Sequence, residues 1–268
     1  MAATTTRTTA VNSDGFARFV EQQRNRFRVL MKCVWNPRLA YSRLETEFLS
    51  PDPVYLEQSQ WIHGALERIA FNQLVPQSRD YDLKLIRPLD RTWGTSITTD
   101  ELCCLLAIAK SVEAKKILEI GTWDGNTTVN LAEATNGMVV TVDLPPDEQH
   151  ASGIPNMTER QQLGRQIRGH PCEPRIRQVY GDSTRLDWKS LGPPFDLVFI
   201  DGAHHYEFVA SDTQNARACV SQGGAIVWHD YAIFRDVSRV VDEMASTASE
   251  LDVYAIQGTR LAVGFRRR

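Results

Sequence analysis

The sequence predicts an α/β fold with a doubly wound, mostly parallel sheet of seven strands that ends in an antiparallel hairpin. Short apolar segments recur along the chain at intervals too long for hairpins. They are continuous apolar runs, which is typical of strands that helices cover on both faces. Helix signals separate these runs, as in βαβ units. With 42% hydrophobic and 24% charged residues, the 268-residue chain also has the composition of a globular protein.

The first part of the predicted fold is a helix, a strand, a glycine turn and a second helix. Thr98 and Glu101 have the spacing of a capping box, which predicts a helix over 99–112. A strand at 116–120 follows, and the next helix starts at Gly125, so that this stretch is half of a βαβ unit. Further parallel strands are predicted at 139–144, 176–180, 195–200 and 224–228.

The last two predicted strands form the hairpin. Residues 253–256 and 261–265 are largely apolar, and the four residues between them include Gly258. A connection of this length joins antiparallel strands. The hairpin brings the predicted sheet to seven strands and distinguishes it from a plain dinucleotide-binding sheet.

Three regions are predicted along the chain. Residues 1–14 are expected to be a disordered tail, and residues 97–268 are expected to form the α/β domain. Between them, residues 15–96 are predicted to be a helical N-terminal cap, because Phe16 and Phe19 have helical spacing and prolines divide the region into short pieces. This cap could supply the interface of a homodimer.

Composition narrows the class of partner. No run of 18 apolar residues occurs, so we expect no membrane span. The net charge of −3 argues against a nucleic-acid partner, whose binding depends on clustered Lys and Arg. The five cysteines lack CxxC spacing, and the N-terminus lacks the apolar core of a secretory signal, so we expect a reducing, cytoplasmic location. A small-molecule partner is the expectation that remains.

Candidate functional residues follow the predicted strands. Ligands of parallel sheets bind beyond the carboxyl ends of the strands, near the point where the strand order reverses. Acidic residues stand at or beyond the ends of all five parallel strands. These positions are Glu119 and Gly121, Asp143, Asp182, Asp201, and the pair His229 and Asp230.

The first turn reads Glu119-x-Gly121-x-x-x-Gly125, with Trp123 where a dinucleotide-binding turn has its second glycine. A pyrophosphate needs close approach to the backbone, so Trp123 disfavours a nicotinamide-dependent oxidoreductase. Asp143 follows Gly121 by 22 residues, a distance that suits an acid which accepts hydrogen bonds from ribose hydroxyls. Asp182 would then lie beside the adenine, although the glycines could serve the turn alone and Asp143 could be a solvated acid.

These motifs resemble class I S-adenosyl-L-methionine (SAM)-dependent methyltransferases, which have a Rossmann-like fold. Residues 200–207 and 223–230 narrow the resemblance to the subfamily of macrocin O-methyltransferases and cephalosporin-hydroxylase-like proteins. The resemblance covers 97–265 and implies SAM as cofactor. The positions that it implies for cofactor binding are Glu119, Gly121, Thr122, Trp123, Gly125, Asn126, Thr127, Asp143, Leu144, Gly181, Asp182, Ser183 and Asp201.

The same resemblance implies the catalytic residues. Asp201 and Asp230 would hold a divalent cation, magnesium or manganese, and His204 would act as base beside Asp201. His229 stands where an oxygen ligand is usual, so the implied metal set is Asp201, His229 and Asp230, and a transition metal or no metal at all remains an alternative. As further alternatives, His229 could pack under the sheet end and His205 could cap the following helix. Asp212, on that helix, is expected to be an exposed acid.

The resulting prediction is a SAM-dependent O-methyltransferase that transfers a methyl group to a hydroxyl of a small molecule. The acceptor is expected to be a sugar, a polyketide or another secondary metabolite. The alternative function is a SAM-binding scaffold or regulatory protein without catalytic activity.

Overall fold

The structure is a computed structural model, and it describes residues 63–86, 97–145, 148 and 162–268. The tail predicted at 1–14 and most of the cap predicted at 15–96 lie outside these described residues.

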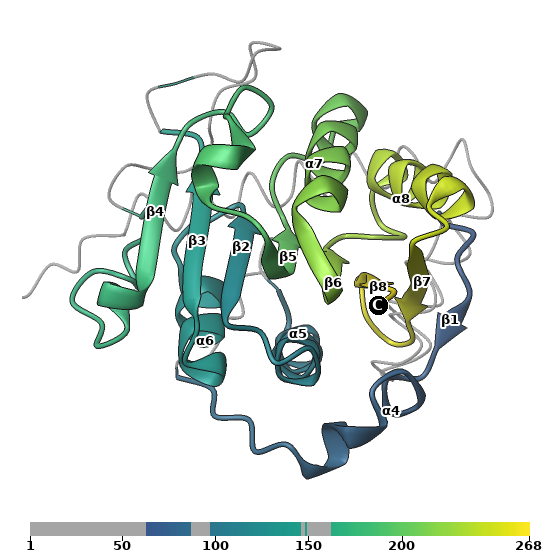
Figure 1. Ribbon diagram of the computed structural model, residues 1–268, viewed down its shortest axis with the longest axis horizontal. Coiled ribbons are helices and arrows are strands. Elements are labelled where there is room, and N and C mark those ends of the chain that lie inside the picture. Colours follow the sequence, from purple (N-terminus) through teal and green to yellow (C-terminus); the bar gives the residue numbers. More distant parts are fainter. Residues whose placement is uncertain (1–62, 87–96, 146–147, 149–161) are drawn as a thin grey trace, which may run out of the picture. The chain divides into compact units, whose positions relative to one another are not determined.

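The described part of the chain is built around an eight-stranded sheet, in the order β1-β7-β8-β6-β5-β2-β3-β4 (Figure 1). The strands are β1 (Arg68–Ile69), β2 (Lys116–Ile120), β3 (Met138–Asp143), β4 (Ile176–Tyr180), β5 (Phe195–Ile200), β6 (Val220–Trp228), β7 (Leu251–Ile256) and β8 (Ala262–Arg266). β8 is antiparallel to both of its neighbours, and the other strand pairs are parallel. The α/β class and the C-terminal hairpin are therefore confirmed.

The number of strands differs from the prediction. All seven predicted strands are present, and β6 begins earlier than expected, at Val220. The eighth strand is β1, which pairs with β7 at the sheet edge and comes from the region predicted to be helical. Two residues with one apolar side chain give no periodic signal, which is why this strand was not predicted.

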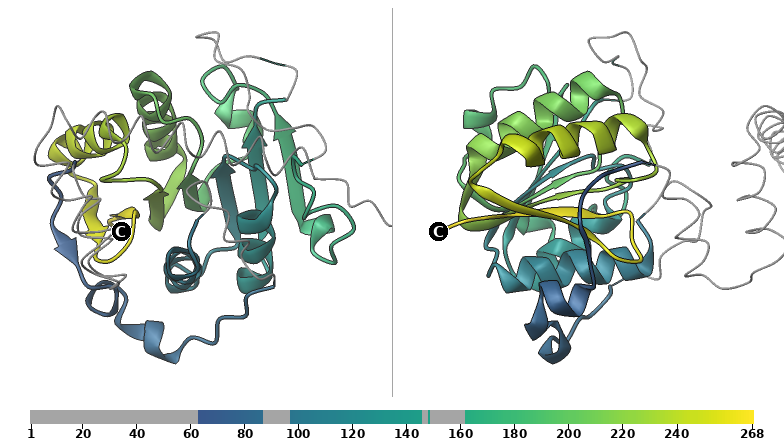
Figure 2. Two further views of the ribbon diagram at one scale, coloured as in Figure 1. Left: turned by 180° about the vertical axis from the view of Figure 1, so that it is seen from behind. Right: turned by 90° about the vertical axis from the view of Figure 1, so that its right-hand side faces the viewer.

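Four longer helices cover the two faces of the sheet, with α5 and α6 on one side and α7 and α8 on the other (Figure 2). Their bounds are α5 (Thr99–Ser111), α6 (Asn126–Thr135), α7 (Tyr206–Cys219) and α8 (Arg235–Thr247). The short elements are α4 (Phe71–Leu74) and the 3-10 turns η2 (Pro76–Asp80), η3 (Glu173–Arg175) and η4 (Trp188–Leu191). None of the described helices combines the length and the hydropathy that a membrane span requires.

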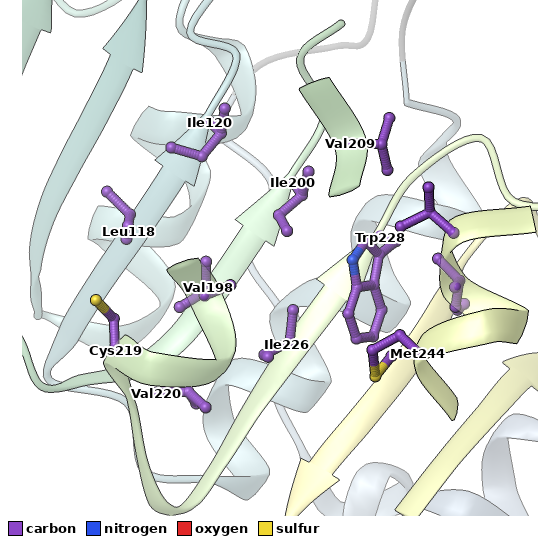
Figure 3. Close-up of a cluster of buried hydrophobic side chains, with 14 of the residues drawn as sticks. Leu118, Ile120, Val198, Ile200, Val209, Cys219, Val220, Ile226, Trp228 and Met244 are labelled. Carbon is purple, nitrogen blue, oxygen red and sulfur yellow. The ribbon is translucent and has the colours of Figure 1, made fainter. Parts of the chain in front are cut away.

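The central strands contribute side chains to two hydrophobic clusters, one on each face of the sheet. Leu118 belongs to the cluster under α7 and α8, whereas its neighbour Ile117 belongs to the cluster with α5 and α6. This alternation follows from the two-residue period of a strand. Figure 3 shows the first cluster, where Trp228 of β6 lies near Met244 of α8. Both faces of the sheet are therefore buried, and the ends of its strands are left for a ligand.

The register of the central strands brings their carboxyl ends to one level. Ile120 of β2 pairs with Val142 of β3 and with Ile200 of β5. Ile200 in turn pairs with Trp228 of β6. From β2, the next strands along the chain, β3 and β4, lie on one side of it in the sheet. β5 and β6 lie on its other side, so the strand order reverses between β2 and β5. This is the point at which ligands of such sheets bind.

Candidate functional site

The predicted site residues form a row along the carboxyl edge of the sheet. The strand order and register place the residues after β4, β3, β2, β5 and β6 beside one another. From one end to the other, the row reads Gly181, Asp182 and Ser183, then Asp143 and Leu144, then Gly121 to Thr127, then Asp201, and finally His229 and Asp230. Residues scattered over more than a hundred positions of sequence are thus neighbours in the fold.

The glycine turn after β2 is tightly packed. Gly121 has a φ of +101°, and a Cβ at this position would lie 2.1 Å from the backbone oxygen of Asp201. Gly125 has a φ of +84° and precedes α6, and a Cβ there would lie 2.7 Å from the Ile167 side chain. The backbone N–H of Trp123, whose φ is +43°, donates to Asp143 Oδ2 at 2.8 Å. The turn therefore requires glycine at positions 121 and 125, and Asp143 fixes the backbone of Trp123 between them.

Glu119 lies under this turn and is buried. Its carboxylate accepts hydrogen bonds from the hydroxyls of Thr128 and Thr141, the latter at 2.7 Å. Burial raises the pKa of Glu119 to about 8, although these two hydrogen bonds oppose the shift. Its Oε1 has no hydrogen-bond partner among the described residues. In this structure Glu119 thus supports the floor of the turn.

The remaining residues of the turn are also fixed by local contacts. Thr122 Oγ1 lies 2.7 Å from Thr141 Oγ1 in the buried floor. The backbone N–H of Asn126 donates to Asp124 Oδ1 at 3.0 Å, and Asp124 is itself buried. Leu144 is buried, whereas Thr127 is half-buried at the start of α6.

At the β4 end of the row, Asp182 stabilises the loop that was predicted to meet an adenine. Its Oδ1 accepts from the backbone N–H of Thr184 at 3.0 Å and from the Thr184 hydroxyl at 2.6 Å. Asp212 of α7 was predicted to be exposed, and this prediction is wrong, because its side chain is buried and hydrogen-bonds to Ser183. Burial raises the pKa of Asp212 to about 7.

At the other end of the row, His229 lies between two carboxylates. Its Nδ1 is 2.9 Å from Asp201 Oδ1, and its Nε2 is 3.2 Å from Glu101 Oε2. Burial alone would lower the pKa of the imidazole, but Asp201 and the other carboxylates outweigh it and raise the pKa to about 10. His229 is therefore an imidazolium that pairs with the carboxylates of Asp201 and Glu101.

Glu101 and Arg260 complete this charge cluster and were not predicted to belong to the site. The Arg260 guanidinium donates to Glu101 Oε1 at 2.9 Å and Oε2 at 2.7 Å, and to Asp230 Oδ1 at 3.0 Å. Burial would raise the pKa of Glu101, but His229 and Arg260 hold it below its usual range. The assignment of Glu101 to the capping box is correct, but it does not include the contacts of Glu101 with His229 and Arg260. No sequence pattern around Arg260, in the hairpin loop, indicates a role in the site.

His204, the predicted base, lies at the open side of this cluster. Its Nε2 is 2.9 Å from Asp230 Oδ2, and 38% of its side chain is exposed. Its ring stacks on Phe234 with centroids 4.2 Å apart and planes 10° apart. The backbone of Asp230 has a φ of +59°, an uncommon conformation that turns the carboxylate toward His204. The neighbouring His205 occupies the N-cap position of α7 without a side-chain capping bond.

The predicted metal ligands are close together, yet the donor atoms of His229 and Asp230 are already engaged. Ligand atoms of Asp201, His229 and Asp230 lie within 4.8 Å of one another. However, both nitrogens of His229 face carboxylates, and both oxygens of Asp230 face cationic or imidazole nitrogen. A metal ion would have to displace His229 from Asp201. The residues in this arrangement therefore do not fit the divalent cation that the resemblance implies.

Comparison with known proteins agrees with the fold. A family model described as a methyltransferase domain matches residues 118–231. The O-methyltransferase NovP has a solved structure that is 16% identical, with a TM-score of 0.51 and coverage of 86% of this chain and 100% of NovP. This likeness shows the same fold. The family match and the shared fold together confirm the resemblance to class I methyltransferases, whereas the macrocin-type subfamily stays a prediction.

Two curated relatives are catechol O-methyltransferases. Catechol O-methyltransferase B of Danio rerio is 22% identical over 173 residues, which are 61% of this chain and 60% of the relative. Catechol O-methyltransferase of Mycobacterium tuberculosis is 32% identical over 110 residues, which are 40% of this chain and 44% of the relative. The chain thus spans less than two thirds of the length of either relative.

Proposed function

Because residues 118–231 carry a methyltransferase domain, on a fold shared with class I enzymes, we propose that this chain is a SAM-dependent O-methyltransferase of small hydroxylated molecules. The observation that carries the proposal is the pair His204 and Asp230 beside Asp201, at the end of the same edge that holds the glycine turn. Methyl transfer to a hydroxyl requires a base close to the bound cofactor, and this edge of the sheet has both a candidate base and a candidate cofactor-binding turn.

The cofactor would lie along the row from Asp182 to Asp201. Carboxylates can accept several hydrogen bonds, so Asp143 suits a ribose and Asp182 suits the amine of an adenine. The φ of +101° at Gly121 supports a turn in which backbone, rather than a side chain, borders the ligand.

The catalytic step needs a group that takes the proton from the acceptor. SAM, when bound, supplies a methyl group on a positively charged sulfur. The Asp230 carboxylate lies 2.9 Å from Nε2 of His204, and a hydrogen on Nε2 would leave the Nδ1 lone pair to take the hydroxyl proton. The imidazolium formed in this way would then be stabilised by the Asp230 carboxylate.

The exposed ring of Phe234 beside His204 favours an acceptor with an apolar face. It holds the plane of the His204 ring by stacking and is 42% exposed beside it. The relatives named catechol O-methyltransferases suggest an aromatic diol as one acceptor to test, together with sugars and polyketides. No divalent cation takes part in this mechanism, because His229 and Arg260 already pair with Asp201, Asp230 and Glu101 and balance two of their three negative charges.

The test is methyl transfer from SAM to a panel of catechols, sugars and polyketides, measured as release of S-adenosylhomocysteine (SAH). We expect His204→Ala to lower kcat by about 100-fold or more, the contribution of a general base, with SAH affinity unchanged. His205→Ala is the matched control and should retain wild-type turnover. Undiminished turnover by His204→Ala would contradict the mechanism. A wild-type protein that binds SAH but methylates no acceptor would favour the non-catalytic alternative.

A further inference from the structure

We infer that Glu133, His170 and Cys172 form a binding site for a divalent transition metal of the zinc type, remote from the candidate active site. One ligand atom of each residue lies within 4.8 Å of the others. Glu133 is in the last turn of α6, and His170 and Cys172 precede β4. Because α6 begins at the carboxyl edge of the sheet and ends before β3 starts, this cluster lies at the opposite edge. It does not depend on the proposed function.

The donor set identifies the class of metal. A thiolate, an imidazole and a carboxylate are the three ligand types that zinc binds, usually in tetrahedral geometry. Magnesium and calcium prefer oxygen alone. With three protein ligands, the fourth position of a tetrahedral ion would be held by water.

The hydrogen bonds of His170 show which of its nitrogens has a lone pair. The backbone N–H of Cys172 lies 3.3 Å from His170 Nδ1 and can only donate, so Nδ1 acts as the acceptor. The same Nδ1 is 3.0 Å from Cys172 Sγ. A metal that replaces the thiol proton would therefore meet a lone pair from the imidazole and one from the thiolate.

Arg175 prepares the third ligand. Its Nη2 donates to Glu133 Oε1 at 2.8 Å, and its Nη1 donates to the backbone oxygen of Ala132 at 2.6 Å. Such outer partners orient ligating carboxylates. Arg175 also balances one of the two negative charges that a thiolate and Glu133 bring, which leaves a net charge of about −1 for the divalent ion.

The site would tie down residues 162–172, which precede β4. This segment contacts the glycine turn through Gly164, whose backbone N–H donates to Trp123 O at 2.7 Å, and through Gln166, whose backbone N–H donates to Asp124 O at 2.9 Å. A metal held by Glu133, His170 and Cys172 would fix the same segment at the other end of α6. Metal binding is therefore expected to stabilise the folded chain.

The test is a titration of the purified, metal-stripped full chain with Co²⁺, followed by absorption spectroscopy. We expect a near-ultraviolet thiolate-to-cobalt charge-transfer band that saturates with a single bound ion and disappears when Zn²⁺ is added. Asp201 and Asp230 offer no sulfur, so binding at that end of the molecule cannot produce the band.

Cys172→Ser should abolish the band, while Cys219→Ser, which removes another buried thiol, should leave it unchanged. His170→Gln, at a half-buried position that disturbs the core less, should weaken Co²⁺ binding by about 10-fold or more. It should also remove the rise in Tm that Zn²⁺ gives to the wild type. Absence of the band in the wild type, or an undiminished band in Cys172→Ser, would overturn the inference.

Discussion

At the scale of single residues, the surroundings of two buried groups give one of them a charge and keep the other neutral. His229 is buried among carboxylates, which keep it charged and raise its pKa to about 10. Glu119 is buried among hydroxyls and carboxylates, and burial raises its pKa to about 8, so the carboxyl is largely protonated at neutral pH. What surrounds a buried group, rather than burial alone, decides whether it carries charge.

The raised pKa of Glu119 predicts how stability depends on pH. In the window from about 4.5 to about 8 the folded chain holds a proton that the unfolded chain has released, so this group makes the free energy of unfolding fall as pH rises. Glu119→Gln keeps the neutral shape and should make this fall shallower. Urea unfolding at several pH values measures it, and an unchanged slope in the variant would contradict the assignment.

At the scale of elements, local signals in the sequence place the helices and strands. The capping box of α5 is confirmed, since Thr98 Oγ1 accepts from the Glu101 N–H at 3.3 Å and Glu101 Oε2 accepts from the Thr98 N–H at 2.8 Å. The Glu101 carboxylate also binds Arg260, so one residue both begins a helix and anchors the charge cluster.

The capping box gives a second prediction. Thr98→Ala removes an acceptor for a helix-end N–H and should lower the free energy of unfolding by about 0.5–2 kcal/mol. Thr98→Ser, which keeps the hydroxyl, serves as the control. Chemical denaturation measures both, and equal losses in the two variants would show that the methyl group, not the cap, matters.

The sequence predicts elements better than it predicts distant contacts. Largely apolar runs predicted all seven longer strands, and they are most continuous in the central strands, where both sheet faces are buried. The register of those strands then brings Asp201 and Asp230 together as expected. The partnership of Glu101 with Arg260 joins residues 159 positions apart, and no local pattern encodes it. Asp212 was misjudged for the same reason, since its burial depends on the loop at Ser183.

At the scale of the whole described domain, a buried ion-pair cluster links the start and the end of the fold. Arg260 in the hairpin loop bonds to Glu101 of α5 and to Asp230 after β6. The loop of the C-terminal hairpin therefore also holds the Asp230 carboxylate.

Removal of Arg260 should consequently be costly. Arg260→Ala removes the guanidinium that pairs with both Glu101 and Asp230, and loss of one partner of a buried pair costs about 3–5 kcal/mol. Arg267→Ala, which breaks an exposed pair with Asp252, should cost no more than about 1 kcal/mol. Urea unfolding compares the two, and a similar small loss in both would argue against a buried cluster.

The central claim is that the carboxyl edge of this sheet binds SAM, and calorimetric titration of the full chain with SAH tests it most directly. The account predicts that the wild type binds SAH and that Asp143→Ala binds at least about 10-fold more weakly, the cost of losing hydrogen bonds to a charged group. Asp252→Ala, an exposed acid on β7, should bind like the wild type. Absence of SAH binding by the wild type, or equal affinity in Asp143→Ala, would contradict the account.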